Sequence, residues 1–261
     1  DHLLMGLRGE NYTKMALTDR VFWENYWRNK PGVVRELKSE DAFSKVFKQI
    51  VAINKPLSAL ELGGFPGYIS IALKKNHNIS NVALLDYYVY EPVVHELLKV
   101  NQLGSDDLKM IESDLFAEYS GEKFDLVHSH GLIEHFEDTE GIIKEHVKYI
   151  SEGGSLLITL PNFRGINGWF QRNFDVENYE KHYIGSMYIP ALEKACDSLG
   201  LKNVKVSYYG RFTIWLENLS SKSKLFYLFF KSTWFIFKVF NVFVPIKNRW
   251  LSPYILITAT K

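Results

Sequence analysis

The stretch ALELGGFPGY, residues 59–68, places three glycines and a proline directly after an apolar run that begins at Leu57. The apolar run predicts a strand, and the pattern after it predicts a helix, so the glycines form the turn between them. Gly63, Gly64 and Gly67 have no Cβ, which permits positive φ and brings backbone amides close to a ligand. In open α/β sheets, this turn lies at the edge where ligands bind. An ordinary strand-to-helix turn is the alternative for this stretch alone.

The chain from residue 57 to residue 161 alternates short apolar runs with helical stretches. The apolar runs include NVALLDYY, LKMIESD, KFDLVHSH and SLLITLPN, and helical patterns such as EPVVHELLKVNQLG stand between them. Runs that are apolar on both faces and followed by helices indicate a parallel sheet covered on both sides. The sequence therefore predicts a doubly wound α/β fold.

The flanking segments predict a helical cap and an insertion. Residues 1–55 form the predicted N-terminal cap. It holds a helix over 18–29, capped by Thr18 or Asp19, and a second helix over 40–53 that follows a capping Ser39. Residues 56–261 form the predicted main domain, with an insertion at about 211–250.

The last hundred residues return to the sheet pattern. After Pro161 the sequence predicts a Gly- and aromatic-rich loop to about Gly185. A helix over 187–200 and strands over 202–209 and 254–261 then follow.

The composition limits the classes of protein. The chain has 261 residues, of which 46% are apolar, so it can bury a large core. Its single cysteine, Cys196, excludes a disulfide framework and a Cys-rich metal site, and favours a reducing compartment. We expect a cytoplasmic protein, because the first residues lack the continuous apolar core of an export signal. A formal net charge of +1 gives no indication of a nucleic-acid partner.

One segment departs from this average. Between Asn218 and Trp250 there are six basic residues and no acidic one, so the remainder carries 25 basic against 30 acidic residues. Residues 224–245, KLFYLFFKSTWFIFKVFNVFVP, predict an aromatic helix on which Lys224, Lys231 and Lys238 recur every seven residues. Lysines within the span make a membrane crossing costly. Two interpretations remain open: a helix that lies in an anionic membrane interface, and a helix whose apolar surface packs on the core, on a second subunit or as a lid over the acceptor.

Acidic residues follow the next two predicted strands. Asp86 lies 19 residues beyond Gly67, where a carboxylate can accept both hydroxyls of a ribose. Asp114, after the third strand, can accept a hydrogen bond from an adenine amino group, and the Leu115 amide can serve a ring nitrogen. A nicotinamide fingerprint fails, because Phe65 and Tyr68 stand where it requires glycine. The alternative is that both aspartates only cap the helices that follow them.

These motifs resemble those of class I S-adenosylmethionine-dependent methyltransferases, in the branch that methylates quinones, lipids, sugars and polyketides. The resemblance lies in LELGGFPG, LLDYY, ESDLF, FDLVHSHGLIEHF and EGGSLLITLPN, in this order, and in EKHYIGSMYIPALEKACDSLGL after the fifth strand. The final YILITATK resembles the last strand of the family. The resemblance implies a Rossmann-like sheet of seven strands in which the last strand is antiparallel.

The resemblance also implies a cofactor and its site. It implies S-adenosylmethionine as the methyl donor and S-adenosylhomocysteine as the product. The implied cofactor residues are Glu61 with Gly63, Gly64 and Gly67 at the methionyl part, Asp86 and Tyr87 at the ribose, Asp114 and Leu115 at the adenine, and Ser129 and His130 near the methyl group. The chain departs from the family at Phe65, where a small residue is usual. This departure supports an alternative hypothesis, in which the cofactor site is weakened or lost.

Residues for catalysis are less defined, because an in-line methyl transfer needs a base only when the acceptor must lose a proton. His130 is the predicted base, and His128 is a weaker candidate on the same side of the strand. His135 matches the family's Glu-His pair and predicts an orienting role at the crevice. His182 and Tyr183 are candidates for acceptor contact. The alternative is that these histidines fill the strand-end layer and bond to the backbone. No trio of His and carboxylates stands out at metal-ligand spacing, so no metal is expected.

The sequence thus predicts an S-adenosylmethionine-dependent methyltransferase that acts on a small molecule, at oxygen or carbon. A non-catalytic partner protein that keeps the fold is the first alternative. A nucleotide-binding oxidoreductase is the second. No nucleic-acid partner is expected.

Overall fold

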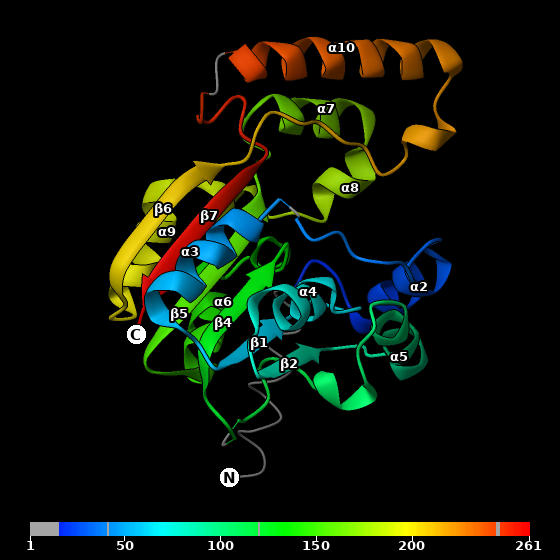
Figure 1. Ribbon diagram of the computed structural model, residues 1–261. Coiled ribbons are helices and arrows are strands. Elements are labelled where there is room, and N and C mark those ends of the chain that lie inside the picture. Colours follow the sequence, from blue (N-terminus) through cyan, green and yellow to red (C-terminus); the bar gives the residue numbers. More distant parts are fainter. Residues whose placement is uncertain (1–15, 41, 120, 244–245) are drawn as a thin grey trace, which may run out of the picture.

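The computed structural model describes residues 16–40, 42–119, 121–243 and 246–261. Its centre is a seven-stranded sheet in the order β3-β2-β1-β4-β5-β7-β6 (Figure 1). The first five strands pair in parallel, and β7 pairs antiparallel with both β5 and β6. The predicted doubly wound α/β fold with an antiparallel last strand is confirmed.

The strands follow the predicted apolar runs. They are β1 (Ser58–Leu62), β2 (Asn81–Asp86), β3 (Lys109–Glu112), β4 (Phe124–His130), β5 (Ile150–Pro161), β6 (Lys202–Tyr209) and β7 (Tyr254–Thr260). The helices that connect or cover them are α2 (Arg20–Asn29), α3 (Ser44–Asn54), α4 (Tyr68–His77), α5 (Glu91–Val100), α6 (Thr139–Tyr149), α7 (Ile166–Phe174), α8 (Val176–Glu180), α9 (Ile189–Ser198) and α10 (Lys224–Phe243).

Alternation along the strands sorts the core into two layers. Leu60 and Leu62 of β1 pack in one buried cluster with α6 and α9, whereas Ala59 packs in another with α3, α4 and α5. Glu61 shares the face of Ala59, because successive side chains of a strand point to opposite sides. Side chains of this face therefore reach the α3 and α4 side of the sheet.

The N-terminal helices match the prediction in part. Asp19 caps α2 and accepts a hydrogen bond from the Phe22 N–H at 2.7 Å, as expected. The prediction that Ser39 caps the next helix is wrong, because α3 begins at Ser44 and follows Phe43, which makes no side-chain cap. The Phe43 ring instead stacks on the His130 ring, with 5.0 Å between centroids, and this packing holds Phe43 outside the helix. The division of the chain near residue 56 stays a prediction.

The segment after β5 differs from the predicted loop. It folds into α7 and α8, because its glycines permit close packing and do not break the chain. A Cβ at Gly168 would lie 1.7 Å from the Phe163 carbonyl oxygen, so only glycine fits there. The aromatic residues of α7 pack against the insertion, where Phe170 lies edge-on to Phe230 at 5.5 Å.

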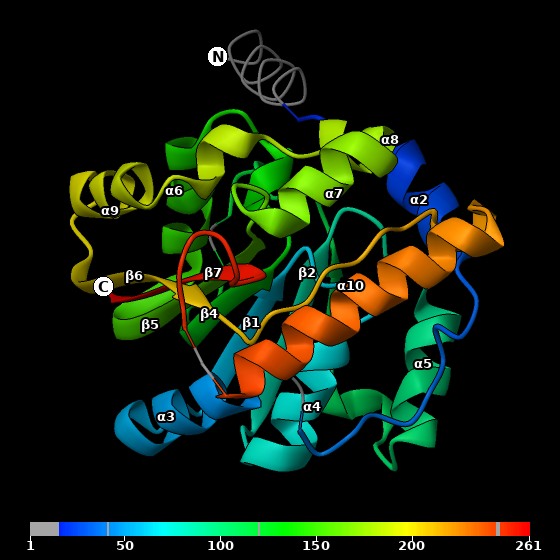
Figure 2. The same cartoon turned by 90° about the horizontal axis from the view of Figure 1, so that it is seen from above.

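The predicted aromatic helix is confirmed as α10, and the Ser223 hydroxyl accepts a hydrogen bond from the Phe226 N–H at 3.2 Å at its start. Figures 1 and 2 show α10 as the outermost layer, beside α7 and away from the sheet. Its inner side chains join a third buried cluster with Phe170, Phe212 and Ile214. None of the helices in the described ranges is long and apolar enough to cross a membrane.

Candidate functional site

A cavity of about 810 Å³ lies at the carboxyl ends of the parallel strands. It collects most of the residues that the sequence singled out: Glu61, Gly63, Gly64, Asp86, Tyr87, Asp114, Leu115, His130 and His135. Gly67 and Ser129 do not line it. Gly67 precedes α4 with φ of +93°. It lies on the side of the turn that faces the core, where a Cβ would lie 3.2 Å from the Leu108 side chain.

The glycine turn is built around a buried carboxylate. Glu61 Oε2 accepts hydrogen bonds from the Ser70 N–H at 2.9 Å and from its hydroxyl at 2.5 Å, which ties β1 to α4. A Cβ at Gly64 would lie 2.2 Å from the Glu61 carboxyl carbon, so the chain passes over Glu61 only as glycine. Gly63 has φ of +63°, and its N–H donates to the Leu85 carbonyl at 2.8 Å. The turn therefore keeps a fixed shape beside the cavity.

Asp86 holds the same turn from the next strand. Its carboxylate accepts hydrogen bonds from the Phe65 N–H at 2.8 Å and from the Tyr88 N–H at 3.2 Å. Burial raises the pKa of Asp86 to about 6, although these backbone N–H groups oppose the shift. A carboxylate can accept several hydrogen bonds at once, so Asp86 keeps capacity for a ligand in the cavity.

Asp114 and Leu115 form the third wall. Asp114 Oδ1 accepts a hydrogen bond from the Phe116 N–H at 2.9 Å within a turn. No helix begins there in the described part of this segment, so the alternative that Asp114 caps a following helix is wrong. Both residues nevertheless line the cavity, with Ser113 and Phe116 beside them. The three strand ends β1, β2 and β3 thus contribute acidic groups and backbone to one space.

Phe65 takes a position that leaves the turn intact. Its side chain is 4% exposed and lies edge-on between Trp27 of α2 and Tyr88, with ring centroids 5.4 and 5.5 Å away. The family usually has a small residue at this position. Here the larger Phe65 ring packs against Trp27 and Tyr88, and these contacts fix α2 against the turn. Phe65 therefore forms part of the cavity wall.

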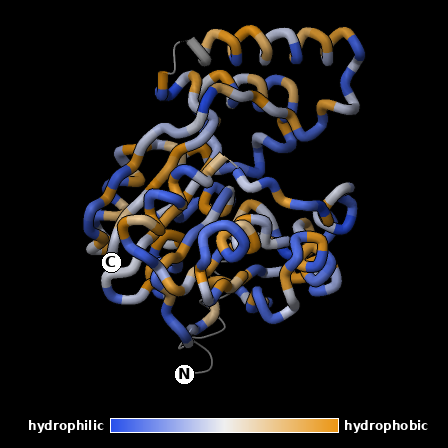
Figure 3. The backbone as a smooth tube through the Cα atoms, in the orientation of Figure 1, coloured by the Kyte–Doolittle hydropathy of each residue, from blue (hydrophilic) through white to orange (hydrophobic). Residues whose placement is uncertain are grey.

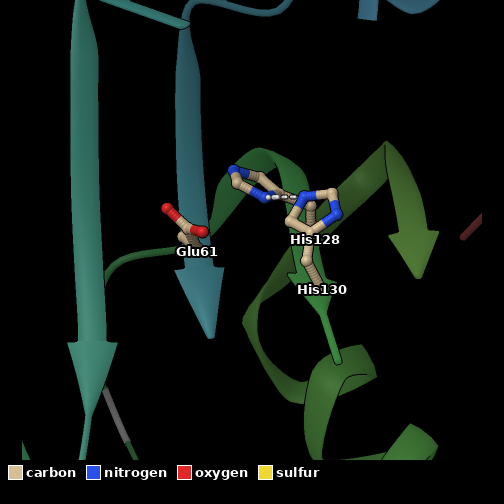
Figure 4. A group of neighbouring side chains, drawn as sticks. All are labelled: Glu61, His128 and His130. Atoms are coloured by element: carbon tan, nitrogen blue, oxygen red, sulfur yellow. Dashed lines mark hydrogen bonds between the residues drawn. The ribbon is translucent and has the colours of Figure 1, made fainter. Parts of the chain in front are cut away.

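The end of β4 carries a chain of histidines (Figure 4). His128 Nδ1 lies 3.1 Å from His130 Nε2, and His130 Nδ1 lies 2.8 Å from the Thr159 hydroxyl on β5. This confirms that His128 and His130 share one side of the strand. Burial lowers the pKa of His128 well below the usual range, and the nearby His130 and His146 add to the shift. The ring is therefore neutral.

Ser129 points to the other face of the sheet. Its hydroxyl lies 2.8 Å from His146 Nε2 of α6, and both side chains are fully buried. Burial also lowers the pKa of His146 to about 4. The Ser129 side chain is thus part of the α6 packing and is not brought to the cavity.

A second hollow of about 570 Å³ adjoins the first and shares His130, Gly131 and His135 with it. Glu134, His135 and His182 meet at its edge, and one ligand atom from each lies within 4.8 Å of the others. Glu61, His128 and His130 form a similar group (Figure 4). The sequence did not reveal either group, because each group joins two residues of one element, η2 (Ile133–His135) or β4, to a third residue that is distant in the sequence.

Burial sets the protonation of the first of these groups. It raises the pKa of Glu134 to about 8. Burial and the neighbouring His182 lower the pKa of His135 to about 3, whereas the hydrogen bond to the Lys181 backbone acts to raise it. His135 is therefore a weak proton acceptor, and an orienting role suits it better than general base catalysis.

Helix α2 contributes a cavity wall that the sequence did not assign. Trp23, Tyr26 and Trp27 line the cavity, and the Trp23 ring meets His135 edge-on at 5.1 Å. The spacing of the aromatic residues in VFWENYWRN predicted an amphipathic helix but not the surface that it covers. The Leu17 N–H donates to the His135 carbonyl at 2.8 Å, which fixes the start of α2 beside η2 (Ile133–His135).

Comparison with known proteins identifies the family to which the chain belongs. Residues 9–206 match the family described as a methyltransferase domain, so the chain belongs to this family. No curated protein matches the sequence. The family and the observed sheet confirm the predicted methyltransferase fold.

Solved structures agree on the fold at low identity. The plantazolicin methyltransferase BpumL in complex with SAH has a TM-score of 0.58 at 16% identity, with 99% of each chain covered. The methyltransferase domain of bacterial CtHen1 has a TM-score of 0.56 at 15% identity, with 84% of this chain and 97% of that chain covered. Phosphoethanolamine N-methyltransferase 2 of Haemonchus contortus, in complex with S-adenosyl-L-methionine, has a TM-score of 0.54 at 17% identity, with 84% of this chain and 51% of that chain covered.

Proposed function

We propose that this protein transfers a methyl group from S-adenosylmethionine to a small molecule, at oxygen or carbon. The observation that carries the proposal is the single cavity in which the glycine turn, Asp86 and the Asp114–Leu115 pair meet. These groups come from three adjacent strand ends and complement a methionyl group, a ribose and an adenine. Family membership and the SAM- and SAH-bound structures of similar fold support the same cofactor.

The second hollow is the proposed place of the acceptor. Its wall combines aromatic side chains, among them Trp215 and Tyr254, with the histidines that it shares with the cofactor cavity. In the reaction, the acceptor atom forms a bond to the methyl carbon while the carbon–sulfur bond breaks and its electron pair returns to sulfur. An oxygen acceptor also loses a proton. His130 is the proposed proton acceptor. Its Nε2 faces His128 and its Nδ1 faces the Thr159 hydroxyl, so the ring exchanges one of these hydrogen bonds for one to the acceptor when it takes the proton.

Calorimetric titration with S-adenosylhomocysteine tests the cofactor site. We expect micromolar binding, and Asp86→Ala should weaken it at least tenfold, because a charge-assisted hydrogen bond to ribose contributes about 1.5–3 kcal/mol. Asp197→Ala, an exposed carboxylate on α9, is the matched control and should bind as the unaltered protein does.

The titration also separates the alternatives. A folded protein that does not bind S-adenosylhomocysteine would support the non-catalytic partner reading, in which Phe65 has closed the site. Unchanged affinity in a folded Asp86→Ala protein would remove Asp86 from the ribose site.

A further inference from the structure

The histidines at the edge of the second hollow have their ring orientation fixed from behind. His135 Nδ1 lies 2.8 Å from the Lys181 carbonyl oxygen, and His182 Nδ1 lies 2.6 Å from the Asn178 carbonyl oxygen. A carbonyl oxygen can only accept, so each Nδ1 carries the hydrogen. In a neutral ring this leaves the lone pair on Nε2. Metal-binding histidines have this arrangement, since their second nitrogen usually donates to a carbonyl or a carboxylate.

Glu134 adds a buried carboxyl group, one oxygen of which lacks a hydrogen-bond partner. Its side chain is 1% exposed, and Oε2 has no hydrogen-bond partner within the described ranges. A buried carboxylate oxygen without a partner is unfavourable, and polar groups of this kind call for an explanation such as an ion. The Glu134 backbone is held as well, because its carbonyl accepts the Tyr183 N–H at 2.6 Å. The oxygen therefore sits on a fixed support beside two imidazole rings.

We propose that Glu134, His135 and His182 bind one divalent transition-metal cation. Their ligand atoms lie within 4.8 Å of one another, and the rings of His135 and His182 are 4.9 Å apart at 44°. Zinc–nitrogen bonds of about 2.1 Å place donors roughly 3–4 Å apart, so side-chain shifts below about 1 Å close the site. Two imidazoles and one carboxylate suit zinc, iron, cobalt or manganese rather than calcium.

The other histidine group is a weaker candidate. His128 Nδ1 and His130 Nε2 face each other at 3.1 Å, and Glu61 Oε2 already accepts two hydrogen bonds from Ser70. Most of its donor atoms are therefore engaged with one another or with the turn, although His128 Nε2 has no hydrogen-bond partner within the described ranges.

The position of the proposed cation indicates a role in binding the methyl acceptor. All three ligands line the second hollow, so open coordination positions face that space. A bound cation would hold an acceptor oxygen near His130 and lower the pKa of that oxygen's proton. This use rests on the proposed function, whereas binding of the cation does not.

Titration of chelator-treated protein with Co²⁺ and Zn²⁺, without cofactor, tests the site. We expect one ion per chain, with the visible absorption of a low-symmetry Co²⁺ site. Glu134→Gln is nearly isosteric, and His182→Asn alters a half-buried position, so both should fold and both should weaken binding at least 100-fold. His95→Asn, an exposed histidine on α5, is the control and should change nothing.

Two outcomes would overturn the site: no binding at millimolar Zn²⁺, or binding that survives both variants. A parallel titration with S-adenosylhomocysteine keeps the two proposals apart. Protein that binds S-adenosylhomocysteine but no metal would refute this site and leave the proposed function standing.

A different observation, the outer face of α10, carries a second inference. Large apolar side chains cover this face: Leu225 is 79% exposed, Leu228 is 63%, and Phe235 and Ile236 are 61% and 64%. The hydropathy map shows apolar segments along α10 that alternate with hydrophilic ones (Figure 3). Exposed apolar surface on this scale indicates an interaction site.

The positive charges of α10 indicate what kind of surface its exposed apolar face binds. At 100° per residue, Lys224, Lys231 and Lys238 fall on one edge of the exposed apolar face, and the Nζ of Lys238 lies 4.3 Å from the Trp234 ring centroid. From Asn218 to Trp250 the sequence has no acidic residue. A second copy of α10 would bring lysines together with no carboxylate of this segment to pair with them. An anionic surface pairs with the lysines and takes up the apolar side chains.

We propose that α10 lies in the interface of an anionic lipid bilayer, with its outer apolar face in the lipid and its lysines among the head groups. Flotation with vesicles that contain phosphatidylglycerol tests it. We expect binding that weakens with salt and is absent with neutral phosphatidylcholine. Lys231→Glu with Lys238→Glu should reduce the partition coefficient at least tenfold. Lys202→Glu with Lys205→Glu, exposed lysines on β6, should leave it unchanged.

Absence of binding to anionic vesicles would overturn the proposal. A salt-insensitive dimer that is lost on Leu228→Ser, together with no flotation, would assign α10 to a subunit interface.

Discussion

At the scale of single residues, Asp86 links folding to pH. Burial raises its pKa to about 6, above the ordinary 3.8. A carboxyl whose folded-state pKa is raised stabilises the fold fully below about pH 4, and this contribution is lost as the pH rises through 6. Asp86→Asn removes the titration. We therefore expect the melting temperature of Asp86→Asn, relative to the unaltered protein, to rise between pH 4 and pH 7, as thermal unfolding without ligand would measure.

A constant difference over that pH range would contradict the shifted pKa. His95→Asn serves as a control, because it replaces an exposed side chain away from the cavity.

The glycine turn allows strain and ligand contact to be separated. Gly63 and Gly153 both have positive φ, of +63° and +75°, but only Gly63 lies at the cavity. Alanine at either position should cost about 1–2 kcal/mol of stability, because L residues are strained in this conformation. At Gly63 the Leu132 side chain must also shift, because a Cβ there would lie 2.5 Å from Leu132 Cδ1, whereas a Cβ at Gly153 meets open space. We expect only Gly63→Ala to weaken S-adenosylhomocysteine binding, by tenfold or more. Equal affinities in calorimetry would mean that Gly63 serves the turn alone.

At the scale of elements, α10 rests on a small cluster of its own. Phe230 is 2% exposed and packs on Phe170, whereas Phe235 is 61% exposed. Phe230→Ala should cost about 3–5 kcal/mol in this cluster, and Phe235→Ala less than about 0.5. We expect faster amide exchange in α7 and α10 for Phe230→Ala, with unchanged S-adenosylhomocysteine affinity. A large loss of affinity would show that the cluster also supports the cavity.

The elements also show what the sequence could predict. Alternating apolar runs predicted all seven strands, and Thr18 or Asp19 marked the start of α2, because periodicity and capping are local signals. The start of α3 was missed, since Phe43 leaves the helix to stack on His130. Helix α7 was missed, since Gly168 is required by contact with Phe163 and not by a turn. Long-range packing decided both cases.

The same limit applies to the site. Carboxylates at strand ends were predictable, because parallel strands end at one edge. The group of Glu134, His135 and His182 was not, because 47 residues separate His182 from His135 and only the fold joins them. The wall formed by α2 was missed for the same reason.

At the scale of the whole molecule, α2 borders both the cofactor cavity and the second hollow, and it is anchored by few contacts. None of its residues is buried, yet Trp23 and Tyr26 line both the cofactor cavity and the second hollow. Its anchors are the ring contacts of Trp27 with Phe65 and of Trp23 with His135, the hydrogen bond from the Leu17 N–H to the His135 carbonyl, and an ion pair between Arg20 and Glu112, with 2.5 Å between Nη2 and Oε1. An exposed ion pair contributes at most about 1 kcal/mol, so α2 is expected to open locally more easily than the sheet.

Ligand binding should therefore protect α2 more than the rest of the chain. Saturating S-adenosylhomocysteine adds contacts to the cavity wall, and a ligand that binds only the closed form stabilises it by mass action, about 2.7 kcal/mol at 100 times Kd. We expect trypsin to cut after Arg28 at least tenfold more slowly with the ligand, as mass spectrometry of the fragments would measure. Cleavage after Lys222 and Lys224, at the start of α10, should keep its rate, because that segment lines neither space. Equal slowing at both places would mean that the ligand stabilises the molecule as a whole, and no slowing at Arg28 would mean that α2 stays outside the bound cofactor.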